Sequence, residues 1–171
     1  MDPQLVVFAG DHGLASRGVS AYPSDVTWQM VENFLAGGAA VSVLARQHGI
    51  ALTVVDCGVK HDFAPRPGLL IQKIGYGTAD SLETTAMTDD QCDQALKNGA
   101  ELLKSLPGNA LLLGEMGIGN TSAASLLMSR LTGLDIVDCT GAGTGLDAAS
   151  VGRKIDILKK VLASHADSIE P

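Results

Sequence analysis

Short apolar runs alternate with segments of helical periodicity along the whole chain. Four runs predict strands, at residues 5–9, 51–56, 69–71 and 110–113, and the first of them suits a strand covered on both faces. Between and after them, apolar residues recur three and four positions apart, which is typical of helices with one buried face. The predicted helices run from Pro23 or Ser24 to 35, then over 39–48, 88–106, 121–132 and 150–163. A further extended segment is expected at Ile136-Val137.

Polar and small residues mark where these elements end. Thr88 followed by Gln91 predicts a capping box, and Pro107-Gly108 ends the same helix. Gly37-Gly38 interrupts two helical segments. The Pro- and Gly-bearing residues 60–68 are expected to form a surface loop.

Strands that alternate with helices predict an α/β fold, a three-layer Rossmann-like parallel sheet flanked by helices. Ligands of such sheets bind outside the carboxyl ends of the strands. Polar clusters follow three of the predicted strands, at Asp11-His12-Gly13, Asp56-Cys57-Gly58 and Gly114-Glu115-Met116-Gly117. We therefore expect these clusters to converge on one edge of the sheet.

The glycine-rich segment after the fourth strand has two interpretations. In one, residues 114–119 form a turn containing Glu115, and the turn and the next helix N-terminus bind an anion such as phosphate. In the other, the turn is only a tight loop, with Asn120 or Thr121 capping the helix. The Lys-[Ser/Thr] pair of a P-loop is missing from this turn, and residues 141–145 match a dinucleotide fingerprint only loosely. Lys154 is either a solvated helix charge or a phosphate ligand.

Size and charge limit the function classes. The length of 171 residues suits one domain, and the net charge of −7 disfavours nucleic-acid partners. No apolar run is long enough to span a bilayer, so a soluble, cytoplasmic protein is expected. Three widely spaced cysteines, Cys57, Cys92 and Cys139, are expected to be reduced, buried thiols.

The sequence offers little evidence for a metal site or for a catalytic nucleophile. Asp11-His12 offers adjacent potential ligands, but a hydrogen-bonded structural turn is favoured over a metal site. His48 and His61 lie at predicted surface positions. A Gly-x-Ser-x-Gly nucleophile elbow is not found in the sequence.

Several long segments, taken together, resemble the nicotinate-nucleotide:dimethylbenzimidazole phosphoribosyltransferases of cobalamin lower-ligand assembly. The resemblance spans most of the chain. The matching segments, in order, are residues 8–13, 18–23 with Val26-Thr27, 33–40, 55–59, 114–121, and 143–147 with Arg153-Lys154.

This resemblance implies a phosphoribosyl transfer from nicotinate mononucleotide to 5,6-dimethylbenzimidazole, giving α-ribazole 5′-phosphate and nicotinate. It implies no metal and no cofactor, small-molecule substrates, and a homodimer or other self-association. The residues 1–171 would be a single α/β domain, part of the family's large domain.

Site residues follow from the same resemblance. The 5′-phosphate would be bound by Gly117, Ile118, Gly119, Asn120 and Thr121, with Lys154 as the cation. Glu115 would favour the oxocarbenium-like transition state electrostatically. The flat base would lie against Tyr22, Pro23, Gln29, Met30 and Met116.

The sequence also departs from the family pattern. The family's general base is a glutamate in a carboxyl-terminal segment, and no position of this chain matches it. We therefore expect a truncated internal fragment that binds nucleotide weakly and turns over poorly or not at all. The alternatives are a non-catalytic Rossmann-like nucleotide-binding module and, less favoured, another ribosyl or phosphoryl transferase.

Overall fold

The computed structural model describes residues 1–168, which form two compact units. The first unit comprises Met1–Asp11, Asp25–Thr78 and Met87–Gly117. The second comprises His12–Ser24, Ala79–Ala86 and the described part of Ile118–Pro171. The prediction of a single domain over 1–171 stays a prediction.

A parallel sheet forms the centre of the first unit. Its four strands are β1 (Pro3–Gly10), β2 (Ala51–Gly58), β3 (Leu69–Ile71) and β4 (Ala110–Met116). Their order in the sheet is β3-β2-β1-β4, and all neighbours are parallel. The predicted α/β fold with a parallel sheet is therefore confirmed.

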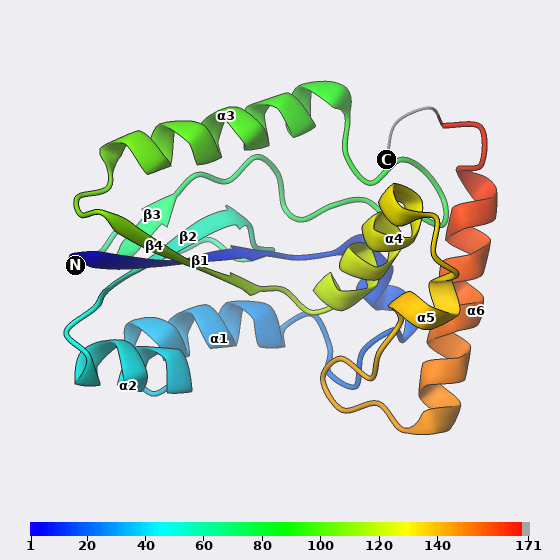
Figure 1. Ribbon diagram of the computed structural model, residues 1–171, viewed down its shortest axis with the longest axis horizontal. Helices are drawn as coiled ribbons and strands as arrows, with labels where there is room; N and C mark the ends of the chain where they lie inside the picture. Colours follow the sequence, from blue (N-terminus) through cyan, green and yellow to red (C-terminus); the bar gives the residue numbers. More distant parts are fainter. Residues whose placement is uncertain (169–171) are drawn as a thin grey trace. The chain divides into compact units, whose positions relative to one another are not determined.

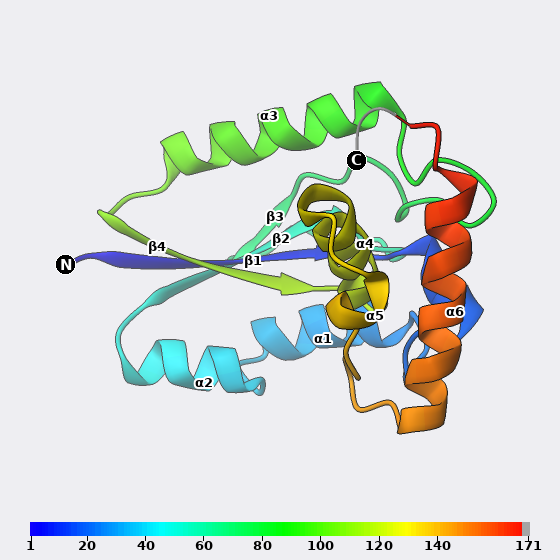
Figure 2. The same ribbon diagram turned by 45° about the vertical axis from the view of Figure 1, so that its right-hand side comes forward.

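Helices cover both faces of this sheet. In Figures 1 and 2, α1 (Val26–Leu35) and α2 (Ala40–Gln47) lie on one face, and α3 (Asp89–Ser105) lies on the other. Val7 and Val54 pack with α1 in one cluster, whereas their neighbours Val6 and Val55 pack with Leu102 of α3 in another. Because successive strand residues point to opposite faces, two covered faces require the continuous apolar runs found in the sequence.

Short-range hydrogen bonds and a glycine fix two of the predicted helix boundaries. Thr88 accepts a hydrogen bond from the Gln91 backbone, and the Gln91 side chain accepts one from the Thr88 backbone, so the capping box is confirmed. Gly37, with φ of 80°, lies between α1 and α2. A left-handed residue of this kind ends a helix at little cost only when it is glycine.

Helices dominate the second unit. They are the short 3₁₀ helix η1 (Gly13–Arg17), α4 (Asn120–Thr132), α5 (Ile136–Cys139) and α6 (Ala148–Ser164). Figures 1 and 2 show α4, α5 and α6 side by side. Their core contains Leu14, Val19, Ile136, Leu158 and Val161.

The predicted extended segment at Ile136-Val137 is wrong, because these residues begin α5. The carboxylate of Asp135 accepts a hydrogen bond from the Val137 amide at 2.8 Å and caps the helix. Ile136 is buried in the core of the second unit. A two-residue apolar run carries too little periodicity to distinguish a helical turn from a strand.

Within residues 1–168, no helix is long and apolar enough to cross a membrane. The cysteines are free thiols, but Cys92 on α3 is exposed, so the expectation of buried thiols is wrong at that position. Cys92 belongs to the first turn of α3, whose buried residue is Leu102 near the other end of the helix.

Candidate active site

The carboxyl ends of β1, β2 and β4 meet at one edge of the first unit. Ala9 of β1 pairs with Asp56 of β2 on one side and with Met116 of β4 on the other. Asp11 follows β1 directly and donates its backbone N–H to the Gly58 carbonyl at 3.1 Å. The predicted convergence of polar residues is confirmed for this edge.

Two buried aspartates organise the loops at this edge. Asp11 is 3% exposed, and one of its carboxylate oxygens accepts a hydrogen bond from the Lys60 amide at 2.7 Å. Asp56 is fully buried and accepts from the amides of Gly58 and Val59 at 3.1 and 2.9 Å. These bonds agree with the favoured structural turn at Asp11. Within residues 1–168, no three His, Cys, Asp or Glu side chains are grouped to hold a metal ion.

Glu115 lies in β4 and not in a turn, so its predicted position is wrong. The strand continues through Gly114, whose missing side chain leaves room for Val7, since a Cβ there would lie 3.0 Å from Val7 Cγ2. Glu115 pairs with Phe8 in register and remains solvent-accessible. Neighbouring protein atoms nevertheless displace water from its carboxyl group and raise its pKa to about 7.

The predicted base-binding residues are divided between the units. Gln29 is exposed on α1, while Met30 and Met116 are half-buried and pack against the same core cluster of the first unit. Tyr22 and Pro23 are exposed residues of the second unit. A common base site for these five residues therefore stays a prediction.

Helix α4 begins without a side-chain cap. Its N-cap residue is Gly119 with φ of 95°, so the interpretation in which Asn120 or Thr121 caps the helix is wrong. A Cβ at Gly119 would lie 3.3 Å from the Cβ atoms of both His12 and Ala15, a tight contact that, together with the positive φ, favours glycine. An uncapped helix N-terminus presents backbone N–H groups and a positive dipole end, which favour an anion.

A buried hydroxyl group lies in the same helical turn. Ser122 is fully buried, and its Oγ has no hydrogen-bond partner among the described residues. An unsatisfied buried hydroxyl costs about 1–3 kcal/mol, so such groups commonly bind a ligand or a water molecule.

Lys154 of α6 lies beside this helix start. It is fully buried, and its Nζ donates to Thr121 Oγ1 at 2.9 Å and to the Gly141 carbonyl at 3.3 Å. Burial lowers the pKa of Lys154 below its ordinary value. The interpretation as a solvated helix charge is therefore wrong, because the amine points into the second unit and reaches the residue predicted to bind phosphate.

The loop before α6 completes this cluster, and sequence reasoning missed its role. Gly143 has φ of 56°, and a Cβ there would lie 2.9 Å from Thr121 Oγ1 and 3.6 Å from Lys154 Nζ. Ser20 and Thr144 share a hydrogen bond of 2.9 Å next to it. The loop over 141–145 thus approaches Thr121 closely at Gly143. In the sequence, the glycine spacing of this loop was the one feature that could have indicated this contact.

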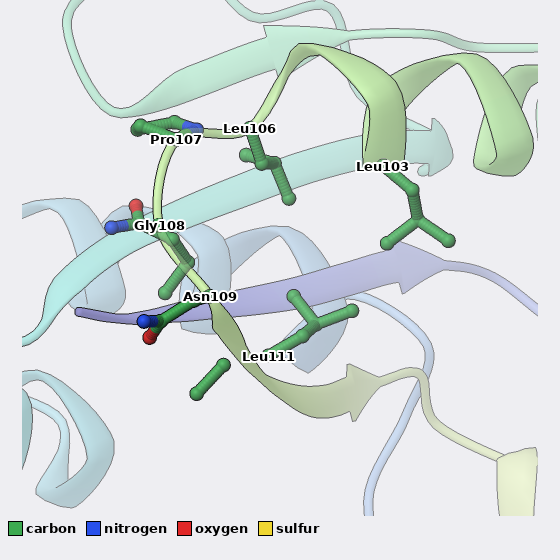
Figure 3. Close-up of a pocket in the computed structure, with 8 residues that line it drawn as sticks. Leu103, Leu106, Pro107, Gly108, Asn109 and Leu111 are labelled. Atoms are coloured by element: carbon green, nitrogen blue, oxygen red, sulfur yellow. The ribbon is translucent and has the colours of Figure 1, made fainter. Parts of the chain in front are cut away.

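A pocket of about 190 Å³ lies at the amino end of β4 in the first unit (Figure 3). Three leucines supply much of its wall. None of the residues that line it is acidic or basic, so it offers no proton-transfer group. The lining residues are Gln4, Leu103, Leu106, Pro107, Gly108, Asn109, Ala110 and Leu111.

The α/β fold and the sequence together are those of a phosphoribosyltransferase family. A family model described as "Phosphoribosyltransferase" matches residues 1–171, and the chain belongs to this family. The resemblance drawn from the sequence motifs is therefore confirmed.

Individual relatives carry a more specific name than the family model does. The chain is 69% identical to the nicotinate-nucleotide–dimethylbenzimidazole phosphoribosyltransferase of Variovorax paradoxus, covering 99% of this chain and 48% of the relative. It is 56% identical to the enzyme of the same name from Dechloromonas aromatica, covering 98% of this chain and 49% of the relative. The chain thus spans about half the length of the curated relatives it matches.

Solved structures agree in fold. The crystal structure of CobT from Thermus thermophilus superposes with a TM-score of 0.91 at 38% identity. The match covers 99% of this chain and 52% of the Thermus chain.

Proposed function

We propose that this protein takes part in transfer of phosphoribose from nicotinate mononucleotide to 5,6-dimethylbenzimidazole. The products are α-ribazole 5′-phosphate and nicotinate, and the reaction belongs to the assembly of the cobalamin nucleotide loop. The observation that carries the proposal is the contact of buried Lys154 with Thr121 at the uncapped start of α4. The names of the relatives supply the substrates.

The 5′-phosphate of the mononucleotide is the ligand we assign to residues Gly117 to Thr121. Backbone N–H groups at the start of α4 bind phosphate oxygens, as at other helix N-termini. Lys154 supplies the positive charge. When phosphate binds, Lys154 exchanges a neutral hydroxyl partner for a negatively charged one. Because Lys154 is buried, water screens the two charges weakly, which strengthens their attraction.

Glu115 acts on the reacting centre in this proposal. A benzimidazole nitrogen attacks C1′ of the ribose, the bond from C1′ to the pyridinium nitrogen breaks, and nicotinate leaves with that electron pair. The attacking ring then loses its N–H proton to a water molecule, which carries it into the solvent. Positive charge that develops on the ribose in the transition state is stabilised by the Glu115 carboxylate. With a pKa of about 7, this group is about half ionised at neutral pH.

The base is the ligand we assign to Gln29, Met30 and Met116 of the first unit. Met30 and Met116 offer polarizable apolar surface, and Gln29 offers hydrogen-bonding groups. The planar benzimidazole matches such a surface because it combines apolar faces with nitrogen atoms at its edge.

Self-association is also part of the proposal. Strand β4 pairs with β1 on one side, and Leu112 and Leu113 are exposed along it. Apolar residues on an edge strand favour association with another chain. We expect a dimer in analytical sedimentation, and a monomer would contradict this part of the proposal. A cytoplasmic location stays a prediction.

Ligand preference tests the proposed function. In isothermal titration calorimetry, the chain should bind nicotinate mononucleotide more tightly than ATP or NAD, because the site holds a single phosphate. Binding without preference for the mononucleotide would instead support a general nucleotide-binding module. No binding of nicotinate mononucleotide would overturn the proposed function. Chromatography of a mixture with 5,6-dimethylbenzimidazole measures turnover separately.

A further inference from the structure

A half-buried lysine, Lys73, joins the loops that follow β2 and β3. Lys73 Nζ pairs with the fully buried Asp56 carboxylate at 3.0 Å. The same nitrogen donates to the carbonyls of Val59 and His61, the latter at 2.9 Å. The ammonium group thus makes one ion pair and two hydrogen bonds within this part of the first unit. The backbone of residues 59–61 is therefore held in place from one point.

Aromatic contacts extend this arrangement. The Lys73 ammonium lies 4.7 Å from the centre of the Tyr76 ring, and the Tyr76 hydroxyl donates to Asp62 at 2.6 Å. Asp62 directly follows His61. Both ends of the short segment 59–62 are thus tied to residues 73–76, which stiffens it.

His61 uses this fixed backbone to support α1. Its ring stacks on Trp28 with centroids 4.8 Å apart and an angle of 14° between the planes. Its edge contact with Phe63 has centroids 4.8 Å apart at 62°. His61 is half-buried between these two rings.

Trp28 connects the stack to the proposed base site. It lies in the first turn of α1 and is followed directly by Gln29 and Met30. Trp28, Met30 and Met116 pack against the same core cluster. A ring that fixes Trp28 therefore fixes one of the side chains that pack against this cluster beside Met30 and Met116.

We propose that His61, held by the Lys73–Asp56 ion pair, is a positioning residue for the acceptor base. It keeps Trp28 in one rotamer, so that Gln29 and Met30 present a preformed surface to a planar aromatic heterocycle. A preformed site avoids the entropy cost of ordering side chains when the ligand binds. This inference rests on the proposed function, and it assigns His61 no contact with the phosphate.

The sole tryptophan of the chain makes the stack directly measurable. Trp28 is the single Trp in 171 residues, so the protein's tryptophan emission reports this site alone. In His61→Ala, Trp28 loses its stacking partner and gains contact with water, and its emission should shift to longer wavelength. His61→Phe restores an aromatic ring and should restore the emission.

Calorimetric titration of 5,6-dimethylbenzimidazole and nicotinate mononucleotide provides the decisive test. His61→Ala should weaken base binding about tenfold and change mononucleotide binding less than about twofold, while His61→Phe should recover most of the base affinity. His48→Ala, at an exposed position after α2, is the matched control and should bind both ligands normally.

A second variant tests the role of the ion pair. Lys73→Met alone leaves a buried, unpaired carboxylate and risks unfolding the chain. The double variant Asp56→Asn/Lys73→Met removes both charges and keeps an oxygen for the Gly58 and Val59 amides. It should reproduce the Trp28 emission shift and the selective loss of base affinity.

The outcomes separate this inference from the proposed function. Unchanged base affinity in His61→Ala, or an equal loss for both ligands, overturns the positioning role. If the unaltered chain binds nicotinate mononucleotide but no base, the positioning role also fails while the phosphate site stands. Failure to bind the mononucleotide overturns the proposed function itself.

Discussion

Lys154 and Thr121 are 33 residues apart in the chain, yet the buried ammonium group donates to the threonine hydroxyl across 2.9 Å. The bond links α6 to the first turn of α4, inside the second unit. It is the contact on which phosphate binding depends in the proposed function.

Replacing Lys154 with Met should weaken phosphate binding without unfolding the chain. Methionine fills a similar volume and eliminates a buried charge, so the free energy of unfolding should stay equal or rise. Loss of a charge-assisted hydrogen bond of about 1.5–3 kcal/mol should weaken nicotinate mononucleotide binding about tenfold to a hundredfold. Calorimetry measures the affinity and thermal denaturation the stability. The control is Lys159→Met, at an exposed position of the same helix.

Gly143→Ala should damage the same site by steric means. The residue has φ of 56°, and its new Cβ would lie 2.9 Å from Thr121 Oγ1. We expect a loss of about 1–2 kcal/mol in stability and a weaker affinity for the mononucleotide. Gly141→Ala is the matched control, because no atom lies within 4 Å of its Cβ position. Equal effects from both substitutions would contradict the steric explanation.

Glu115→Gln should change how stability depends on pH. The pKa of Glu115 is about 7 in the folded chain and 4.5 as its ordinary value, so the folded state binds the proton more tightly. The stability that this proton contributes is complete below pH 4.5 and is lost as pH rises through 7.

Glutamine does not titrate, so the variant does not lose stability in this way as the pH rises. The difference in melting temperature, variant minus unaltered chain, should therefore increase between pH 4.5 and 8. Glu115 is exposed to solvent, which screens the effect, so we expect about 1 kcal/mol or less. Thermal melts across this pH range measure it, with Glu101→Gln on the surface of α3 as the control. A constant difference at all pH values would contradict the raised pKa.

Thr88→Ala should destabilise α3 by removing its capping box. The Thr88 hydroxyl accepts from the Gln91 amide at 3.2 Å, and no other residue supplies this cap in the described helix. We expect a loss of about 1 kcal/mol, measured by urea denaturation. Thr85→Ala, at an exposed position outside the helix, should have little effect.

The thiols should differ in reactivity. Burial raises the pKa of Cys57 to about 11, so at pH 8 only about one thiol in a thousand is the reactive thiolate. Cys92 is exposed on α3. Mass spectrometry after brief iodoacetamide treatment should find Cys92 alkylated well before Cys57. Faster alkylation of Cys57 would contradict both its burial and its raised pKa.

Local sequence patterns determined most of the secondary structure. The aliphatic runs predicted all four strands because a strand covered on both faces needs apolar residues at every position, as at Val6 and Val7. The capping box at Thr88 was predictable because its two hydrogen bonds join residues only three positions apart. The family was predictable because its motifs recur in order along the chain.

Register and burial needed the tertiary structure. Glu115 belongs to β4 because backbone pairing with Phe8 extends the strand beyond its apolar run, and no local pattern encodes that pairing. The start of α5 at Ile136 likewise depends on burial against α6, together with the Asp135 cap.

The two lysines show most clearly what the sequence determines and what only the tertiary structure determines. The sequence alone left Lys154 as either a solvated charge or a ligand, and it carried no motif at Lys73. Folding buries Lys154 beside Thr121 and pairs Lys73 with Asp56. Periodicity determines which face of an element is apolar, but the environment of a charge depends on residues distant in the chain, and only the packed structure brings those together.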